Sequence, residues 1–213
     1  MNIFKKLLNK ISGNIVNIKA KRINNKAESY WRTHLKENNF SIICSSCIGG
    51  VIYNRLGKQF LSPTINLFFT QSDFIKFSVN LKYYLSLDLK FIKTDKVYPV
   101  AMLDDITIHF NHSKSEFDAA NDWNRRKKRI NFDNIYLIFY YREGYSIEQI
   151  REIEKANYKR VILLSYKDLD LDYSYKIESD SDEPANDNFL TKDKYGLRTF
   201  ERKWDFVSWL NGD

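Results

Sequence analysis

The side chains best suited to chemistry in this chain are two cysteines and two histidines, and the cysteines come first, in the run FSIICSSCIGG over residues 40–50. The aromatic and β-branched residues of this run predict a buried strand that ends at Cys44. Cys47 then precedes a helical pattern, and the free N–H groups of a helix N-terminus lower the pKa of a thiol. Cys47 is therefore a candidate nucleophile. The candidate ligand-binding residues beside it are Ser46, Gly49 and Gly50, whose two glycine amides are candidate oxyanion donors.

The spacing of the two cysteines allows other interpretations. A Cys-x-x-Cys pair is also the pattern of a redox centre or of half a zinc site. Zinc needs about four ligands, and the chain has no second such pair, so we expect no metal. A redox pair places both thiols at the helix start, whereas Cys44 is predicted to lie inside the strand as a core residue. The other alternative is that Cys47 is only a small residue in a tight turn.

The second candidate group is the run His109-Phe110-Asn111-His112. Alternation along a strand puts the first two residues on opposite faces, and His112 lies just past the strand end, where a side chain can face a cleft. His112 is the candidate general acid and base, with Asp105 or Asp104 as the carboxylate that would orient it. His109 is a candidate substrate-binding residue, and the alternative for it is a half-buried packing histidine. No feature of the sequence fixes the distance between His112 and Cys47.

The third candidate group is the basic run from Trp123 to Arg129, at the predicted end of a helix. Arginine binds carboxylate and phosphate groups through paired N–H donors, so this run has candidate anion-binding residues. These residues are Arg125, Arg126 and Arg129. Trp123 is a candidate stacking surface for a sugar. The alternative is a solvated helix end, because cations at a helix C-terminus are stabilised by the helix dipole.

The elements that must position these groups alternate between strands and helices. Strands are predicted over residues 40–44, 64–69, 135–140 and 161–164, with a hairpin over 100–103 and 106–110. Helices are predicted over residues 72–85 and 115–129, from Ser146 onward, and around residues 204–210, with Ser72, Ser115 and Ser146 as the N-caps of the first three. This order predicts a three-layer α/β/α fold with a mainly parallel, mixed sheet.

The positive charge of the chain is concentrated at its N-terminal end. The net charge is +7 overall, but residues 1–36 hold nine Lys and Arg residues against the single acid Glu28, a net charge of +8. The remainder therefore carries −1, which makes nucleic acid an unlikely partner. Apolar residues recur at helical spacing in this segment, at Ile3, Phe4, Leu7, Leu8 and Ile11. The segment is thus predicted to be a basic amphipathic helix, which either contacts an anionic membrane surface or packs on protein.

Length and composition predict an N-terminal extension over residues 1–37 and a single α/β domain over residues 38–213. A mobile acidic loop is predicted at about residues 168–194 within that domain. No run approaches the roughly 18 apolar residues that a membrane span needs, and the use of cysteine fits a reducing compartment. We therefore expect a cytoplasmic protein that is at most peripheral to a membrane.

Taken together, these motifs resemble domain-of-unknown-function family 1919. The resemblance covers roughly residues 38–212, and three of the ordered runs that carry it are IICSSCIGGVIYNRLGKQFLSPTINLFF, YPVAMLDDITIHFNHSKSEFDAANDWNRRKKRINFDNIYLIF and FVSWLNG. It implies a three-layer α/β/α fold and a setting among bacterial capsule or exopolysaccharide genes. Family members usually carry Asn-Asn-Cys-Trp-Gly-Gly at this turn, so Cys47 and both glycines match the family and the residues around them do not. The turn is also similar to that of SGNH hydrolases and acyltransferases, but their catalytic His lies near the C-terminus, and this chain has none after His112.

These observations predict a protein of surface-polysaccharide biosynthesis that modifies a glycan or sugar precursor by acyl transfer. Cys47 would be the nucleophile, His112 would move protons, and the donor would be a co-substrate such as acetyl-CoA, with no permanently bound cofactor. The alternative is a non-catalytic subunit that binds a glycan or nucleotide sugar. A Cys47 thiol beside an imidazole would favour the enzyme, and a closed site with Cys47 buried would favour the binding protein.

Overall fold

The protein is described by a computed structural model over residues 3–141, 146–178 and 189–213, with side chains from residue 16 onward. Its helices are α1 (Ile3–His34), α2 (Ile48–Leu56), α3 (Gln71–Val79), α4 (Leu81–Ser86), α5 (Glu116–Lys127), α6 (Ile147–Arg151), the 3-10 helix η1 (Glu152–Lys155), α7 (Thr199–Lys203) and α8 (Phe206–Asn211). Its strands are β1 (Ser41–Cys44), β2 (Lys90–Ile92), β3 (Val100–Leu103), β4 (Ile106–His109), β5 (Ile135–Tyr140), β6 (Arg160–Ser165) and β7 (Ser174–Lys176).

The residues group into two compact units by their internal contacts. The first unit contains residues 1–38, 55–57 and 177–213, and the second contains residues 39–54 and 58–176. The predicted acidic loop at 168–194 includes strand β7, whereas its residues 179–188 lie outside the described part of the chain. The side chains of the predicted N-terminal apolar stripe also lie outside it.

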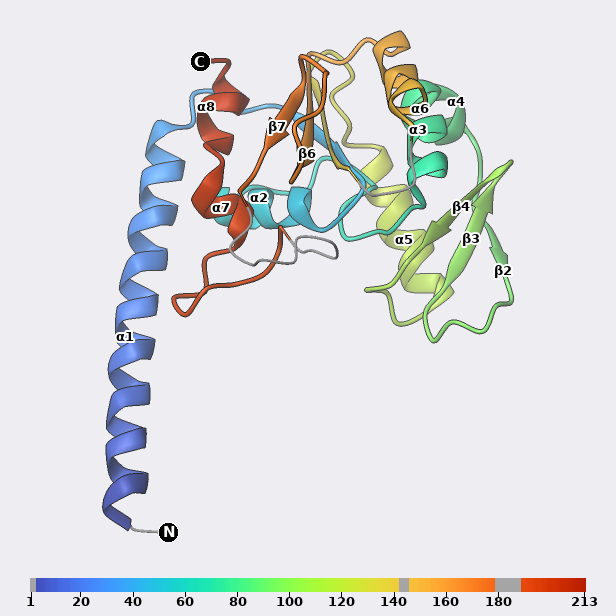
Figure 1. The fold of residues 1–213 in the computed structure, drawn as a ribbon. Coiled ribbons are helices and arrows are strands. Elements are labelled where there is room, and N and C mark those ends of the chain that lie inside the picture. Colours follow the sequence, from blue (N-terminus) through green and yellow to red (C-terminus); the bar gives the residue numbers. More distant parts are fainter. Residues whose placement is uncertain (1–2, 142–145, 179–188) are drawn as a thin grey trace. The chain divides into compact units, whose positions relative to one another are not determined.

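A parallel sheet of four strands, in the order β1-β5-β6-β7, forms the centre of the second unit (Figure 1). Side chains alternate across the sheet, so Leu137 and Phe139 of β5 join the apolar cluster that also contains residues of α3 and α6. On β5 the intervening residue Tyr136 stacks with Phe40, which stacks in turn with Tyr53 of α2. Helices therefore cover both faces of the sheet, and the predicted α/β fold is confirmed.

Strand β1 is an edge of this sheet, and side-chain hydroxyls bond to its outer N–H groups. The Tyr53 hydroxyl accepts a hydrogen bond from the backbone N–H of Ile42 at 3.0 Å and donates one to the Phe40 carbonyl at 3.1 Å. The Thr64 hydroxyl accepts one from the backbone N–H of Cys44 at 3.0 Å. Exposed strand edges attract further strands, and these bonds occupy the groups with which a further strand would pair.

The segment over residues 64–69 is not the strand that its apolar pattern predicts. Asn66 adopts a left-handed backbone conformation with φ of 61°, which breaks an extended chain, and Asn is among the residues that tolerate it. Only one β-bridge forms among the described residues here, between Phe68 and His109. The backbone of Thr64 is not part of a strand, and its side-chain hydroxyl bonds to β1.

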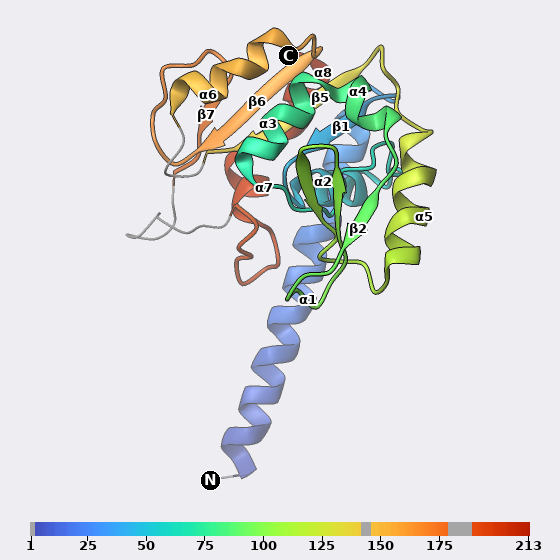
Figure 2. The ribbon, with the colours of Figure 1, turned by 90° about the vertical axis from the view of Figure 1, so that its right-hand side faces the viewer.

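The predicted hairpin forms from β3 and β4, but it belongs to a separate antiparallel sheet in the order β2-β3-β4. The parallel sheet is therefore not mixed, and the antiparallel strands form a second sheet in the same unit. Helix α5 lies beside this sheet (Figure 2), and its Trp123 ring lies 6.3 Å from the ring of Phe110. The cap predicted for α5 is confirmed, because the Ser115 hydroxyl accepts a hydrogen bond from the backbone N–H of Asp118.

The helix predicted over residues 72–85 divides in two at Asn80, whose φ of −116° and ψ of 39° are not helical. The N-cap of the first part, α3, lies two residues earlier than predicted, at Thr70 rather than Ser72, and the Thr70 hydroxyl accepts a hydrogen bond from the backbone N–H of Asp73. The cap predicted at Ser146 for α6 is confirmed as a capping box with Gln149.

The first unit is built around an ion-pair network between the two ends of the chain. Arg55 pairs with Glu28 of α1 at 2.9 Å and with Glu201 of α7 at 2.5 Å, where the Glu201 side chain is fully buried. The ring of Trp31 packs 5.0 Å from that of Phe206 in α8. Among the residues described, no helix is long and apolar enough to cross a membrane.

We expect Tyr53→Phe to lower the free energy of unfolding by about 1–3 kcal/mol, because it leaves the Ile42 N–H and the Phe40 carbonyl buried without their partner. Urea unfolding followed by circular dichroism measures this change. The matched control is Tyr83→Phe, which removes an exposed hydroxyl bonded to Asp104 and should cost much less. Equal effects of the two substitutions would contradict the role given to Tyr53.

Candidate active site

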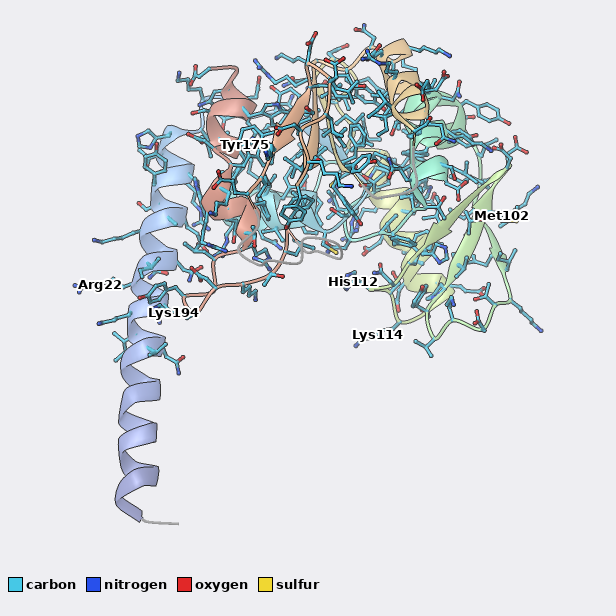
Figure 3. All side chains as sticks on the ribbon, viewed as in Figure 1. Arg22, Met102, His112, Lys114, Tyr175 and Lys194 are labelled. Carbon is cyan, nitrogen blue, oxygen red and sulfur yellow. The ribbon has the colours of Figure 1, made fainter. Side chains whose placement is uncertain are left out.

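The structure brings together the two residues that carry the predicted chemistry. The Sγ atom of Cys47 lies 3.3 Å from Nε2 of His112, which is hydrogen-bonding distance for sulfur. Cys47 is half-buried between β1 and α2, and His112 is exposed on the loop between β4 and α5 (Figure 3). An imidazole at this distance can take the proton of a thiol and return it to a leaving group.

The turn that carries Cys47 is fixed at both of its ends. On the strand side, the backbone N–H of Ser45 donates to the Ile138 carbonyl of β5 at 3.3 Å. On the helix side, the hydroxyl of Ser46 accepts a hydrogen bond from the backbone N–H of Ile48 at 3.3 Å. Ser46 is thus engaged in forming the start of α2, and its predicted contact with a ligand remains a prediction. Cys47 stands immediately before the first residue of α2, as the sequence predicts.

Gly49 and Gly50 are buried, and close packing explains both of them. A Cβ atom at Gly49 would lie 3.0 Å from Cβ of Cys44, and one at Gly50 would lie 2.4 Å from Oδ1 of Asn66. The two glycines let α2 pack against β1 and the segment around Asn66. The role of their amides as oxyanion donors remains a prediction.

Cys44 and Cys47 have different surroundings and are not joined by a disulfide. Cys44 is completely buried, and burial raises the pKa of its thiol, although hydrogen bonds from Ser46 and the Gly49 backbone oppose that shift. A thiol held in its protonated form in the core is a poor nucleophile and a poor redox partner. Within the described ranges no group of three or more His, Cys, Asp or Glu side chains is placed to hold a metal ion.

Asp105 does not lie where it could orient His112. It precedes β4, whereas His112 follows the other end of that strand, and strand residues rise by about 3.3 Å each. The Asp105 carboxylate pairs with Lys76 at 2.7 Å and accepts a hydrogen bond from the Tyr84 hydroxyl at 2.6 Å. These partners lower the pKa of Asp105. The two residues therefore lie at opposite ends of β4, as the hairpin pattern itself implies, and these contacts give the predicted orienting role no support.

His109 packs against two aromatic rings. It is half-buried on β4, its ring 5.3 Å from that of Phe68 and 6.0 Å from that of Tyr98. Burial lowers its pKa, and its Nδ1 atom is buried with no hydrogen-bond partner among the described residues. These surroundings fit the packing histidine that the sequence analysis gave as the alternative.

The basic end of α5 contributes one arginine to the site. The Arg126 side chain is 13% exposed, and its guanidinium donates to the Ile65 carbonyl at 3.2 Å and to the Asp122 carboxylate at 2.6 Å. Arg125 pairs with the same carboxylate but is mainly exposed. Arg129 is half-buried, and its backbone N–H donates a hydrogen bond to the Arg126 carbonyl.

Trp123 does not have the exposed ring that its predicted stacking role needs. It is 1% exposed, and its ring packs 6.3 Å from the ring of Phe77. The amphipathic pattern of α5 explains this position, because Trp123 and Ala119 are the buried residues on the face that α5 turns to the core.

A cavity of about 100 Å³ lies beside His112 in the second unit. Arg126 lines it together with Asp122 and Trp123 from α5, and Asn66 lines it from the segment after α2. Asn66 was not among the predicted site residues, because its run of apolar neighbours was interpreted as a strand. Its left-handed conformation is of a kind that clusters at functional sites, and an Asn within an apolar run was the signal available in the sequence.

Comparison with known proteins gives two matches. The family described as "Domain of unknown function (DUF1919)" matches residues 17–211 of this chain. An uncharacterized protein of Haemophilus influenzae (strain ATCC 51907 / DSM 11121 / KW20 / Rd) is 29% identical over 179 residues, which cover 83% of this chain and 86% of that protein.

We expect iodoacetamide at neutral pH to label Cys47 well before Cys44, because Cys44 is buried and its pKa is raised by that burial. Peptide mapping by mass spectrometry measures both sites in one sample. His112→Ala should slow labelling of Cys47 by removing the base beside it, and Lys114→Ala, an exposed change on the same loop, should not. Preferential labelling of Cys44 would reverse the assignment.

Proposed function

This chain belongs to the family described as a domain of unknown function, DUF1919, and on that premise we propose that it is a cytoplasmic enzyme of surface-polysaccharide biosynthesis. It would transfer an acyl group to a glycan or sugar precursor. The observation that carries the proposal is the 3.3 Å contact between the Cys47 thiol and the His112 imidazole. The sequence analysis named a thiol beside an imidazole as the arrangement that separates an enzyme from a non-catalytic binding protein.

The position of Cys47 supports a nucleophilic role. It stands at the carboxyl end of a parallel strand and at the start of a helix, where ligands of open α/β sheets commonly bind. The partial positive charge of the helix N-terminus favours a thiolate and an oxyanion over their neutral forms. Cysteine also needs less activation than serine, so a cysteine and a histidine without an orienting carboxylate form a sufficient pair.

The proposed reaction has two steps. In the first, His112 takes the Cys47 proton, the sulfur attacks the carbonyl carbon of a thioester donor such as acetyl-CoA, and the donor's thiol leaves with the proton from His112. In the second, His112 takes the proton of a sugar hydroxyl, whose oxygen attacks the acyl group on Cys47. The ester product leaves, and His112 returns the proton to the Cys47 sulfur. The exposure of His112 supports this scheme, since donor and acceptor must both reach it.

The choice of a sugar hydroxyl as acceptor depends on the setting among capsule and exopolysaccharide genes that the family resemblance implies. A hydrolase would use the same pair of residues with water in the second step. Both reactions share the acyl-enzyme, so its formation is the first property to test.

We expect incubation with acetyl-CoA to add one acetyl group to Cys47, detected by intact-protein and peptide mass spectrometry. Cys47→Ser should not form this thioester. His112→Ala should form it about a hundredfold more slowly or worse, as loss of a general base usually does. Both variants should keep the melting temperature within a few degrees, because Cys47 and His112 are not core residues.

The matched control is Lys114→Ala, which changes an exposed residue near His112 and should acylate at the wild-type rate. Full polymer modification by a Cys47→Ala variant in cells would remove the covalent mechanism. It would favour the alternative that the protein is a glycan- or nucleotide-sugar-binding subunit.

We also propose that helix α1 holds the protein at an anionic membrane surface near its substrate. Lys19, Lys21 and Arg22 are exposed on this helix, as Figure 3 shows for Arg22, and Ile18 is 68% exposed beside them. Basic residues near an anionic leaflet contribute about 1 kcal/mol each, and an exposed apolar residue adds burial in the interface.

We expect the full-length protein to co-sediment with vesicles that contain anionic lipid at low salt and to be released at high salt. Changing Lys19, Lys21 and Arg22 to Glu should abolish this binding. The control variant changes three exposed lysines of the second unit to Glu and should bind as the wild type does. These lysines are Lys90, Lys93 and Lys114. Equal sedimentation of the two triple variants would show that α1 does not contact the membrane.

A further inference from the structure

The lining of the cavity beside His112 includes several hydrogen-bond donors, which suit a ligand that carries acceptor atoms. Arg126 and Asn66 contribute a guanidinium and an amide to its lining. Trp123 lines it as well, and its indole Nε1 is buried with no hydrogen-bond partner in the described part of the chain. Buried donors are nearly always satisfied, so a buried indole N–H without a partner indicates an acceptor that is supplied from outside.

Arg126 is held rigidly in this lining and keeps donors for a ligand. Its bonds to the Ile65 carbonyl and Asp122 use two guanidinium nitrogens, and the group carries further N–H donors. Its guanidinium also lies 5.2 Å from the ring centre of Phe60, which restricts it further. A preorganised arginine loses less entropy on binding an anion than a flexible surface lysine does.

The lining contains one arginine and one carboxylate, Arg126 and Asp122, and a second arginine outside the lining adds positive charge next to them. Arg125 and Arg126 share the single carboxylate of Asp122, which leaves one positive charge uncompensated in this group. Burial lowers the pKa of Arg126, which reflects the cost of keeping its charge away from water. An anion in the cavity would offset that cost. Because the Arg126 side chain is largely shielded from water, its attraction to the anion would be stronger than that of an exposed arginine.

The size of the cavity limits the ligand to a small group. An apolar cavity of about 150 Å³ binds benzene, so the 100 Å³ here has room for roughly four or five heavy atoms. A carboxylate with its attached carbon, or a phosphate group, has this size and carries the oxygen acceptors that the lining requires. A long acyl chain does not fit.

We propose that this cavity is an oxyanion-binding subsite that holds a carboxylate or phosphate group of the acyl donor close to the carbon that Cys47 attacks. The inference rests on the proposed function for the identity of the donor, whereas binding of the anion itself does not depend on catalysis. It assigns the subsite to Arg126, Asn66 and Trp123, and it leaves Arg125 and Arg129 outside.

The test measures binding of inorganic phosphate and of succinate by isothermal titration calorimetry, with protection of Cys47 from iodoacetamide as a second readout. The wild type should bind at least one of these anions and protect Cys47. Arg126→Met should weaken binding about tenfold or more, as expected for loss of a charge-assisted hydrogen bond. Trp123→Phe, which keeps the aromatic ring and loses the N–H, should weaken it less but measurably.

Two controls make the result specific. Arg129→Met removes a charge from the same end of α5 and should bind as the wild type does, and Arg126→Lys keeps the charge and should retain part of the affinity. Tighter binding of phosphate identifies a phosphoryl group of the donor, and tighter binding of succinate identifies a carboxylate. An equal loss for Arg129→Met and Arg126→Met, or no binding of either anion by the wild type, would overturn the proposal.

The two proposals fail separately. Cys47→Ser cannot be acylated by the proposed route but should bind the anion with unchanged affinity. A protein that binds the anion and never forms an acyl-enzyme would retain the subsite and lose the acyl-transfer reaction. A protein that is acylated on Cys47 and binds neither anion would keep the reaction and lose the subsite.

Discussion

The position of the candidate site depends on how the outer edge of β1 is hydrogen-bonded. Two hydroxyls satisfy that edge, one from Tyr53 in α2 and one from Thr64 in the segment that follows α2. The first fixes α2, at whose start Cys47 stands, and the second fixes the segment that brings Asn66 to the cavity. A neighbouring strand in the same place would exclude both of them. The nucleophile and part of the ligand-binding lining are therefore set by the same few bonds to one strand.

The remaining parts of the site come from the separate antiparallel sheet and from α5. His112 follows β4, and the bridge between Phe68 and His109 ties that sheet to the segment after Asn66. Arg126 reaches the same segment through the Ile65 carbonyl. The segment over residues 64–69 therefore bonds to β1 through Thr64, to β4 through Phe68 and to α5 through Ile65. These bonds connect the strand that precedes Cys47 with the strand that precedes His112.

Local signals predicted much of this arrangement. The apolar run before Cys44 and the Ser115 and Ser146 caps depend on neighbouring residues, and the structure confirms them. The pairing of Cys47 with His112 was suggested by residue type alone, since no spacing relates residues this far apart. Asp105 does lie in the predicted turn between β3 and β4, and β4 separates it from His112, so the hairpin pattern itself spoke against the orienting role. Helical phase grouped the basic residues of α5 but could not show that Arg126 is the one that lines the cavity, and an apolar run hid the left-handed Asn66.

The first unit joins the two ends of the chain, and this has a consequence for the order of folding. Arg55 pairs both with Glu28 of α1 and with the buried Glu201 carboxylate of α7. The contacts of this unit therefore span most of the sequence. Contacts of long sequence separation form slowly, because a large loop must close first. During synthesis, the second unit is complete once Lys176 has left the ribosome. Helix α1, which is made before the second unit, must then wait for α8 before its Trp31 can be buried against Phe206, so α1 needs protection in the nascent chain for longer than the second unit does.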